Sequence, residues 1–373
     1  MKRGVLLLLL VLQTILSAQQ IKLKATTIWE IGGANEKRKE LFFKMPVSIA
    51  ADKDNNLYIS ENNGTKIIKC SKEGNWIRMI GGPGSGPGEF KHIQTMFITA
   101  DNEILVKDEV NGRYMFLSLD GRYIKSVPIR GENQKLYKLR NFFGDKFYAQ
   151  VIVNENKSKH GNKFVVLDKN LENKITSFGY SSIFWDYETM MGKTQDDFCA
   201  LNSLCGSNSR FWVSKNYYDG RIYLFDKQKD WKLTVLEGKK ISHASYEIIE
   251  KKSFSDMRSK NKKDGFTYLS FGTSFNGSEK VVFLKEITKS IGLFEYNAKY
   301  IINFIVHNYG KDKFIFGAEL FSTGGKYLGF YEIKEIKGET LDEVLCMDNE
   351  GNFIMRAFDK GAFLIRKFKL SIS

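Results

Sequence analysis

The stretch DNNLYISENNGTKIIKCSKEGNWIRMI at residues 54–80 is followed by a second version of itself, DNEILVKDEVNGRYMFLSLDGRYIKSV, at residues 101–127. The two copies lie 47 residues apart and align without a gap. Matching positions keep the chemical type of the side chain: Asp54 and Asp101, Leu57 and Ile104, Lys66 and Arg113, Gly74 and Gly121, Trp76 and Tyr123. A period of about 40–50 residues built from short apolar runs and turn residues is typical of a β-propeller.

The first copy shows how one blade is assembled. Four short apolar runs, at 47–50, 57–60, 66–70 and 76–80, are separated by turns rich in Asp, Asn and Gly. Asp and Asn side chains hydrogen-bond their own backbone, and both residues tolerate the left-handed conformations that tight turns need. The pattern therefore predicts a four-stranded antiparallel meander, which is the unit of a propeller.

The pattern returns more weakly along the rest of the chain. We interpret four further units, at 141–178, 197–236, 279–306 and 341–370. The last unit holds three apolar runs, and the segment TTIWEI at residues 26–31 supplies an additional strand near the beginning of the chain. Pairing the two closes the ring and removes exposed sheet edges. We therefore predict an all-β fold with six four-stranded blades; residues 308–337 form an elaborated hairpin or, in the alternative, a seventh blade.

The first residues have the form of an export signal. Lys2 and Arg3 precede an apolar run at 5–12, and Ser17-Ala18 supplies the small residues that a signal peptidase requires. The apolar run is too short to span a membrane, and no later stretch approaches 18 apolar residues. We expect a signal peptide at 1–18, a single propeller domain at 19–373, and a secreted or periplasmic protein without an integral membrane segment after cleavage.

The chain is basic, with a formal net charge of +14 that becomes +12 when Lys2 and Arg3 are removed. A basic exported protein meets acidic glycans, anionic lipid headgroups or nucleic acid. Lys is scattered along the whole chain, so the charge is also explained by solubility and codon usage. Export separates the protein from cellular RNA, and we expect no nucleic-acid partner. Cys199 and Cys205 are six residues apart, and a disulfide between them is left open.

Three motifs resemble NHL repeats: the run DNNLYI at 54–59, the turn NGTKI at 63–67 and the Gly-rich connector GGPGSGPGEF at 81–90. The resemblance is specific for residues 45–130, although HIQ at 92–94 replaces the Pro that usually follows the connector. The whole chain is also similar to exported six-bladed propeller proteins of bacteria. The resemblance implies a propeller fold and a tendency to bind partners, because propellers host both enzymes and recognition modules.

Signals for catalysis are weak. His92, His160, His243 and His307 share no spacing typical of metal ligands, and no Ser lies in a nucleophile-elbow motif. The likeness to six-bladed lactonases implies calcium as a candidate cofactor, held by carboxylates and amides. The acidic residues available for it have no distinctive spacing: Glu188, Asp196, Asp197, Asp264 and Glu295. We predict no catalytic residue, no metal ligand and no cofactor, and keep a calcium-dependent lactonase, hydrolase or lyase as the alternative.

One face of the disc carries the candidate binding residues. The turns between second and third strands and the connectors between blades emerge on the same face. They carry two sets of side chains: the turn cations Lys66, Arg113 and Arg221, and the loop residues Trp185 and Tyr187 in 178–197 and Arg258 in 251–263. Aromatic rings beside cations suit acidic sugars or an extended peptide. The alternative is that the turn cations brace neighbouring turns and that the loop packs its own apolar side chains.

These observations predict an exported, monomeric, non-catalytic scaffold that binds a protein, an acidic glycan or another cell-envelope component. A calcium-dependent propeller enzyme is the alternative, and a purely structural subunit of an envelope assembly is a third interpretation. Replacing Trp185 and Tyr187 by Ala separates a binding role from a core role, because only loss of core residues lowers the melting temperature strongly.

Overall fold

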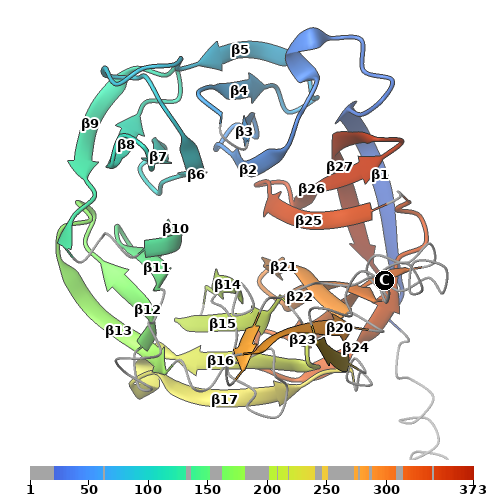
Figure 1. The fold of residues 1–373 in the computed structure, drawn as a ribbon. Coiled ribbons are helices and arrows are strands. Elements are labelled where there is room, and N and C mark those ends of the chain that lie inside the picture. The colour runs from blue at the N-terminus through green and yellow to red at the C-terminus, as the bar shows by residue number, and fades with distance from the viewer. Residues whose placement is uncertain are drawn as a thin grey trace, which may run out of the picture.

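A computed structural model describes the chain over residues 21–61, 64–131, 136–151, 162–180, 201–207, 209–216, 218–239, 246–250, 273–275, 278–284, 288–307, 314–337 and 340–373. In this part of the chain, six four-stranded antiparallel sheets stand around a central axis as a closed ring (Figure 1). The predicted all-β, six-bladed propeller of four-stranded blades is confirmed.

The first three blades follow one another along the chain, each running from the axis outward. Blade one contains β2 (Pro46–Ala51), β3 (Leu57–Glu61), β4 (Ile67–Cys70) and β5 (Trp76–Ile80). Blade two contains β6 (Ile93–Ile98), β7 (Ile104–Asp108), β8 (Arg113–Leu117) and β9 (Tyr123–Pro128). Blade three contains β10 (Leu136–Asn141), β11 (Phe147–Val151), β12 (Asn162–Leu167) and β13 (Lys174–Tyr180).

The other three blades complete the ring, and blades five and six contain the longest strands. Blade four contains β14 (Leu201–Cys205), β15 (Arg210–Lys215), β16 (Arg221–Asp226) and β17 (Lys232–Glu237). Blade five contains β21 (Thr288–Tyr296), β22 (Tyr300–His307), β23 (Ile315–Ser322) and β24 (Tyr327–Glu332). Blade six contains β25 (Thr340–Met347), β26 (Asn352–Asp359), β27 (Ala362–Ile372) and β1 (Leu23–Gly32). Short 3₁₀ helices are η1 (Lys39–Leu41) and η6 (Lys227–Lys229).

The repeated turns explain why blades one and two share a register. Asn55 and Asn102 occupy equivalent positions in the first turn and both have a left-handed backbone, with φ of 64° and 62°. Gly74 and Gly121 do the same in the last turn, with φ of 81° and 92°. Asn and Gly are the residues that adopt this conformation at least cost. The gapless sequence repeat is therefore a repeat of turn geometry.

The N-terminal strand closes the ring, as predicted. β1 pairs antiparallel with β27, from Leu23 opposite Ile372 to Gly32 opposite Leu364, and becomes the outermost strand of blade six. Without it, the eleven-residue strand β27 would be an unpaired sheet edge. The ring is thus completed by two segments from opposite ends of the chain (Figure 1).

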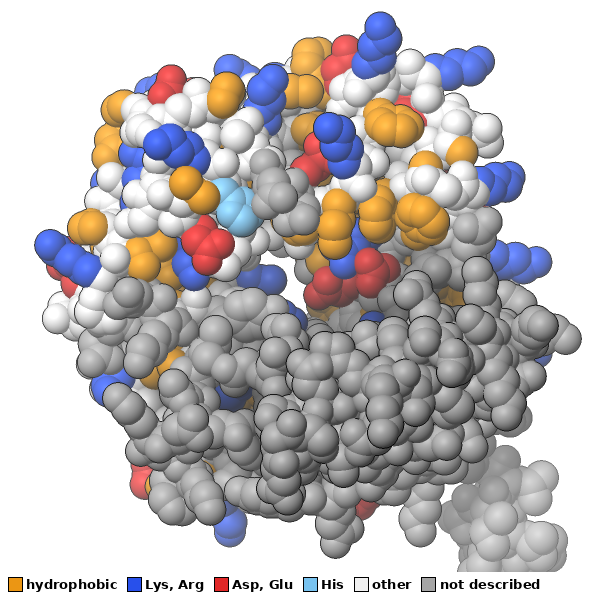
Figure 2. Space-filling view, in the orientation of Figure 1, with side chains coloured by type: hydrophobic (Ala, Val, Ile, Leu, Met, Phe, Trp, Pro, Cys, Tyr) orange, Lys and Arg blue, Asp and Glu red, His pale blue; other side chains and the backbone are white. Residues whose placement is uncertain are grey.

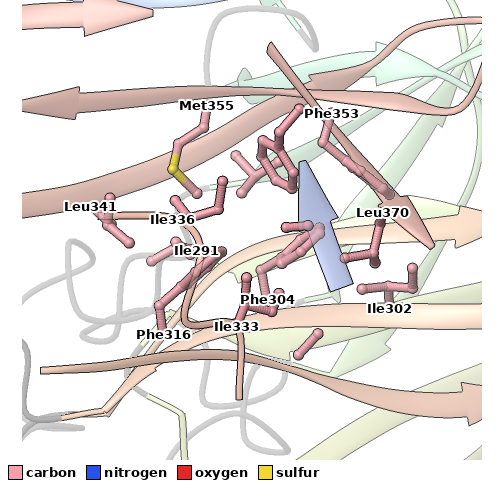
Figure 3. Packing of buried hydrophobic residues seen from close by; sticks show 14 of the residues in the cluster. Ile291, Ile302, Phe304, Phe316, Ile333, Ile336, Leu341, Phe353, Met355 and Leu370 are labelled. Atoms are coloured by element: carbon pink, nitrogen blue, oxygen red, sulfur yellow. The ribbon is translucent and has the colours of Figure 1, made fainter. Parts of the chain in front are cut away.

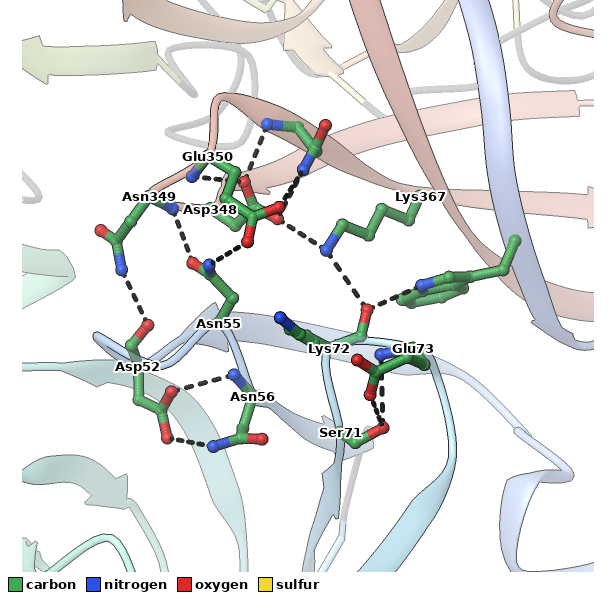
Figure 4. A network of polar contacts seen from close by, with 12 residues as sticks. Asp52, Asn55, Asn56, Ser71, Lys72, Glu73, Asp348, Asn349, Glu350 and Lys367 are labelled. Carbon is green, nitrogen blue, oxygen red and sulfur yellow. Dashed lines mark hydrogen bonds and ion pairs between the residues drawn. The ribbon is translucent and has the colours of Figure 1, made fainter.

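A network of turn residues reinforces this junction between blades six and one, which we call the closing seam (Figure 4). Asn349 donates from Nδ2 to the carbonyl of Asp52 (2.9 Å), and its backbone N–H donates to Oδ1 of Asn55 (2.9 Å). Nearby, Nζ of Lys367 forms a buried ion pair with Asp348 (2.7 Å) and donates to the carbonyl of Lys72 (3.3 Å). Side chains almost 300 residues apart along the chain therefore join the first and last blades.

Blade five differs from the expected unit at 279–306. Residues 278–284 form β20 (Ser278–Leu284), which pairs with β18 (Tyr246–Glu250) and β19 (Thr273–Phe275) in a separate three-stranded sheet. The segment 308–337 was expected to be an elaborated hairpin or a seventh blade; its strands β23 and β24 are the outer two strands of blade five. An apolar run at 280–284 has the same local pattern as a blade strand, so the sequence pattern alone did not separate the inserted sheet from the ring.

The core is divided among the seams between neighbouring blades. The described part of the chain contains six buried apolar clusters, one at each seam. At the seam of blades five and six, Phe304 and Phe316 pack with Phe353, Met355 and Leu370 (Figure 3). Each fully buried side chain of this size contributes about 1.5–3 kcal/mol. Each blade is therefore held mainly by its two neighbours.

Polar side chains also link successive blades close to the axis. Lys107 of β7 donates from Nζ to the carbonyl of Leu136, the first residue of β10, at 2.9 Å. Gln150 of β11 donates to Leu201, the first residue of β14, at 2.8 Å. Arg356 of β26 reaches the carbonyl of Pro46, the first residue of β2. The second strand of one blade thus positions the inner strand of the next blade.

Candidate functional site

A cavity of about 790 Å³ lies on the axis of the ring. All six inner strands contribute to its lining: β2, β6, β10, β14, β21 and β25. Figure 2 shows an opening at the centre of the disc, with acidic and basic side chains beside it. A concave space of this volume is in the range that small-molecule ligands occupy.

The cavity reaches one particular face of the disc. Its lining takes the last residues of β2 and β6, and also the turns that follow β10 and β14, with Phe142, Phe143, Gly206 and Ser207. In an antiparallel meander, these first-to-second strand turns lie opposite the second-to-third strand turns and the connectors. The cavity therefore extends toward the face opposite the second-to-third strand turns, beside which Lys66, Arg113 and Arg221 lie.

The walls of the cavity are sheet edges. Each inner strand is hydrogen-bonded to the second strand of its own blade, and in the described sheets it has no strand on its other side. An edge strand presents a row of backbone N–H and C=O groups. Six such edges converge on the axis, so the walls supply both hydrogen-bond donors and acceptors to a ligand.

Strand β10 contributes a long, charged side chain with an unusual backbone conformation to the lining. Its pairing with β11 shifts register between Tyr137 and Arg140, and Lys138 in this bulge has a left-handed backbone with φ of 49°. A non-glycine residue in this region is rare and often marks a functional position. The bulge turns Lys138 and Arg140 to the cavity, where both are part of the lining.

The environment of Lys138 disfavours its positive charge. Burial lowers the pKa of Lys138; Glu343 opposes this effect, and Arg140 adds to it. Nζ of Lys138 donates to the carbonyl of Leu201 at 3.3 Å. A desolvated ammonium beside a second cation gains from any anion that approaches it.

Arg140 has a guanidinium group that the protein itself uses little. Its Nη1 donates to the carbonyl of Leu139 at 2.8 Å, and its Cζ lies 6.0 Å from the ring centroid of Phe97. Within the described ranges, Arg140 forms no ion pair with a carboxylate. A guanidinium carries five N–H donors in a planar fork, so most of this hydrogen-bonding capacity is available at the cavity wall.

The acidic groups of the channel already have partners. Asp342 and Glu343 of β25 lie 2.7 Å and 3.6 Å from Nη2 of Arg356. Glu295 of β21 accepts hydrogen bonds from the backbone N–H (2.6 Å) and the hydroxyl of Ser207. Burial also lowers the pKa of Lys289 near Asp342 and Glu343. The acidic side chains around the cavity are therefore hydrogen-bonded or ion-paired to other groups of the protein.

A buried polar chain leads away from the cavity at the seam of blades four and five. Asn202, which lines the cavity, donates to the hydroxyl of Ser290 at 2.9 Å, and Ser290 donates to Oδ1 of Asn303 at 2.6 Å. Glu319, which is fully buried, accepts from Asn303 at 3.4 Å and from the hydroxyl of Tyr218. The backbone N–H of Lys239 also donates a hydrogen bond to Glu319, at 2.5 Å. Burial raises the pKa of Glu319, and these hydrogen bonds oppose the rise.

The predicted turn cations have distinct surroundings. Lys66 is exposed. Arg113 donates to the carbonyls of Gly86 (3.0 Å) and Glu89 (2.9 Å) in the Gly-rich connector. Arg221 donates to Asp219 at 2.7 Å. Bracing contacts of this kind were the alternative interpretation of these cations, and ligand binding by the three residues stays a prediction.

Other predicted residues lie outside the described ranges. These are Trp185, Tyr187 and Arg258 of the binding loops, Cys199 of the open disulfide, the proposed signal peptide, and the acidic residues Glu188, Asp196, Asp197 and Asp264. Cys205 and Cys346 are free thiols in the cavity lining, and burial raises their pKa values. Within the described part of the chain, no group of three or more His, Cys, Asp or Glu side chains is arranged to hold a metal ion.

No pattern in the sequence indicated that Lys138 and Arg140 would line the cavity. Their segment LYKLRN at 136–141 does not match the repeat, and the bulge that turns both side chains inward depends on pairing with β11. The departure of this inner strand from the pattern of β2 and β6 was the one available signal.

Comparisons with known proteins agree on the architecture. A family model, DUF5128, described as a six-bladed β-propeller, matches residues 38–326. A solved member of the DUF4221 family from Bacteroides vulgatus has a TM-score of 0.59 and 10% identity, covering 95% of this chain and 100% of that chain. A structure described as a putative exported protein from Bacteroides fragilis has a TM-score of 0.54 and 12% identity, with coverages of 95% and 96%.

A third structure, the calcium-binding protein regucalcin from Agrobacterium tumefaciens, has a TM-score of 0.50 and 8% identity, covering 92% of this chain and 94% of that chain. At these identities, the likenesses show a shared fold. No curated protein matches the sequence significantly. Among the described residues, no helix has the length and apolar character needed to cross a membrane.

Proposed function

The chain belongs to the DUF5128 family of six-bladed β-propellers, and from this premise we propose that it is an exported binding protein that holds its ligand at the axial cavity. The ligand is a glycan or another component of the cell envelope, and binding is not accompanied by chemistry on the ligand. The first two blades have the repeat character of NHL propellers, which are used as recognition modules.

The axial cavity is the observation that carries this proposal. It is lined by strands of all six blades, and its volume of about 790 Å³ suits a small molecule or the end of a chain. The edges of the inner strands offer hydrogen-bonding groups, and β10 adds two cations. The pairing of β1 with β27 closes the ring around this lining, and a binding site that is formed before the ligand arrives has a lower ordering cost.

Export is supported by two independent features. The first 18 residues have the basic, apolar and small-residue order of a signal peptide. A structural neighbour with the same fold is described as a putative exported protein. We therefore expect the mature protein in the periplasm or outside the cell, where envelope glycans are accessible.

A binding screen of the purified mature protein tests the proposal. The panel contains neutral and acidic glycans and solubilised envelope fractions, each measured at low and at high salt. We expect saturable, one-to-one binding of at least one glycan or envelope component, with recovery of the ligand unchanged. Absence of saturable binding across the panel contradicts the proposal, and conversion of the ligand into a product favours the calcium-dependent enzyme instead.

The double variant W185A/Y187A locates the binding surface. If the ligand is held at the axial cavity, we expect the affinity of the double variant to stay within about twofold of the parent protein. A loss of tenfold or more, with an unchanged melting temperature, supports instead the binding surface predicted from the loop composition.

A further inference from the structure

We propose that the axial cavity is a carboxylate-recognition site for an acidic saccharide, in which the Arg140 guanidinium and the Lys138 ammonium receive the carboxylate. This inference rests on the proposed function, because it names the ligand class of the same cavity. It assigns the specificity of the site to a single bulged strand, β10.

The hydrogen-bonding capacity of Arg140 is the first argument. One N–H group contacts the carbonyl of Leu139, and within the described residues no carboxylate pairs with the guanidinium. Phe97 lies beside it, with 6.0 Å between Cζ and the ring centroid, and restricts its orientation. A planar fork of N–H donors on a cavity wall matches the two oxygens of a carboxylate.

The placement of Lys138 is the second argument. Its left-handed backbone is a strained conformation for a long side chain, and such strain persists where the surrounding structure imposes it. The result is an ammonium held within the same cavity as Arg140. Two neighbouring cations repel one another in a partly desolvated space, and an anion between them relieves that repulsion.

The charge balance of the channel is the third argument. Arg356 is paired with Asp342 and Glu343, and Glu295 is engaged by Ser207. The carboxylates in the described lining are therefore held by other groups, whereas the guanidinium of Arg140 forms no ion pair with a described carboxylate. An anionic ligand is favoured at the β10 side of the cavity.

The walls explain why the anion is expected to be a saccharide. Hydroxyl groups both donate and accept hydrogen bonds, and the six converging strand edges offer both kinds of partner. Phe97, Phe143 and Phe294 add apolar surface to the lining, against which the C–H faces of a sugar ring pack. A uronic acid combines these hydroxyls with the carboxylate that Arg140 suits.

Digalacturonate and its methyl ester provide a matched pair of probes, because esterification removes the negative charges and keeps the sugar rings. Binding of both is measured by calorimetry to the mature protein and to three variants. R140Q removes the guanidinium, R140K keeps a charge without the planar fork, and R122Q removes one charge from an exposed turn of blade two. Circular dichroism melting shows whether each variant is folded.

We expect the parent protein and R122Q to bind digalacturonate with the same affinity within about twofold. We expect R140Q to bind it about 10- to 100-fold more weakly, since hydrogen bonds to charged groups contribute that factor. R140K is expected to lie between the two, and the methyl ester to bind weakly to all four proteins. Raising the salt concentration should weaken the binding of digalacturonate more than that of the ester.

Three outcomes overturn the inference. Equal losses in R140Q and R122Q indicate diffuse attraction to a basic protein, and unchanged binding in a folded R140Q places the carboxylate elsewhere. Failure of digalacturonate to bind, while another glycan or envelope component binds, rejects the carboxylate site and leaves the proposed function standing. Failure of every probe in both experiments rejects both proposals.

Discussion

The closing seam and the seam of blades four and five each join two neighbouring blades, but the polar contacts that join them are of different kinds. At the closing seam, polar turn residues of blades one and six, such as Asp52, Asn55 and Asp348, link the two blades (Figure 4). At the other seam, Asn303 and Glu319 lie in strand interiors and are fully buried. Both seams also contain an apolar cluster.

The comparison of the two seams separates the recurring turn contacts of the propeller from the contacts that are confined to one seam. In the Asx-type turn of blade one, the Asp52 carboxylate accepts hydrogen bonds from backbone N–H groups of its own turn. The Asp52 carbonyl and the Asn55 side chain of the same turn accept hydrogen bonds from the neighbouring blade. The polar chain of blades four and five has no counterpart in the sequence pattern and leads to the cavity through Asn202. A buried polar network is costly unless each member finds a partner, so this seam is specialised beyond what closure of a ring requires.

Deleting residues 1–32, which include β1, should have the largest effect. Blade six loses its outer strand, and β27 becomes an unpaired edge of eleven residues. We expect loss of the cooperative monomeric fold, seen as aggregation by size-exclusion chromatography with light scattering. Deleting residues 1–20 alone is the control and should leave a folded protein. A monomeric β1 deletion with an unchanged urea midpoint would show that the ring does not depend on this strand.

Replacing Lys367 by Met should break the closing seam less completely. The change leaves Asp348 as a buried carboxylate without its ion-pair partner at 2.7 Å. Removing one partner of a buried pair costs about 3–5 kcal/mol, and we expect the free energy of unfolding in urea to fall by that amount. Lys334→Met is the matched control, because the Lys334–Glu332 pair is exposed; its expected loss is about 0–1 kcal/mol. Similar losses in both variants would contradict a special role for the buried pair.

Glu319 gives the seam of blades four and five a dependence on pH. Burial raises the pKa of Glu319 above its ordinary value of 4.5. The protonated side chain therefore contributes fully to stability below pH 4.5, and this contribution is lost as the pH rises through the pKa of the folded state. Glu319→Gln removes this ionisation. We expect the free energy of unfolding of the parent protein minus that of E319Q to decrease from pH 4 to pH 8, by about 1.4 kcal/mol for each unit of raised pKa. Urea titrations at several pH values measure this difference, and a constant or increasing difference would contradict the predicted direction.

Replacing Asn349 by Ala should have the smallest effect. It removes the hydrogen bond of 2.9 Å to the carbonyl of Asp52 and keeps the backbone contact with Asn55. One such bond contributes about 1 kcal/mol, which we expect as the loss of unfolding free energy in urea. Asn75→Ala, in an exposed turn of blade one, is the control and should stay within about 0.5 kcal/mol. A loss above 3 kcal/mol would show that the closing network acts as one unit.

The sequence predicted the architecture well where local chemistry repeats. The turns at Asn55, Asn102, Gly74 and Gly121 need left-handed backbone, and only a few residue types supply it, so the repeat in the sequence is a repeat in structure. The closing strand was recognisable because residues 26–31 match the outer strand of blade one. Blade five was assigned incorrectly because a short apolar run has the same pattern in a blade and in the inserted sheet.

The candidate site was much less accessible to sequence reasoning. The turn cation Arg113 contacts the connector, whereas the cavity cations Lys138 and Arg140 were not singled out. Their exposure to the axis follows from a register shift against β11 and from the meeting of six inner strands. Neither the register shift nor the meeting of the inner strands produces a periodic pattern in a single sequence.

By itself, the sequence determined the strand period, the turn chemistry and the closure of the ring, because these depend on residues close together in the chain or on one repeated pattern. The tertiary structure alone decided which side chains share the axial cavity and which carboxylates already have partners. Those relations join Lys138 and Arg140 of blade three to Glu295 of blade five and Glu343 of blade six. The free energy of such contacts depends on distance, burial and charge in space rather than on position along the chain.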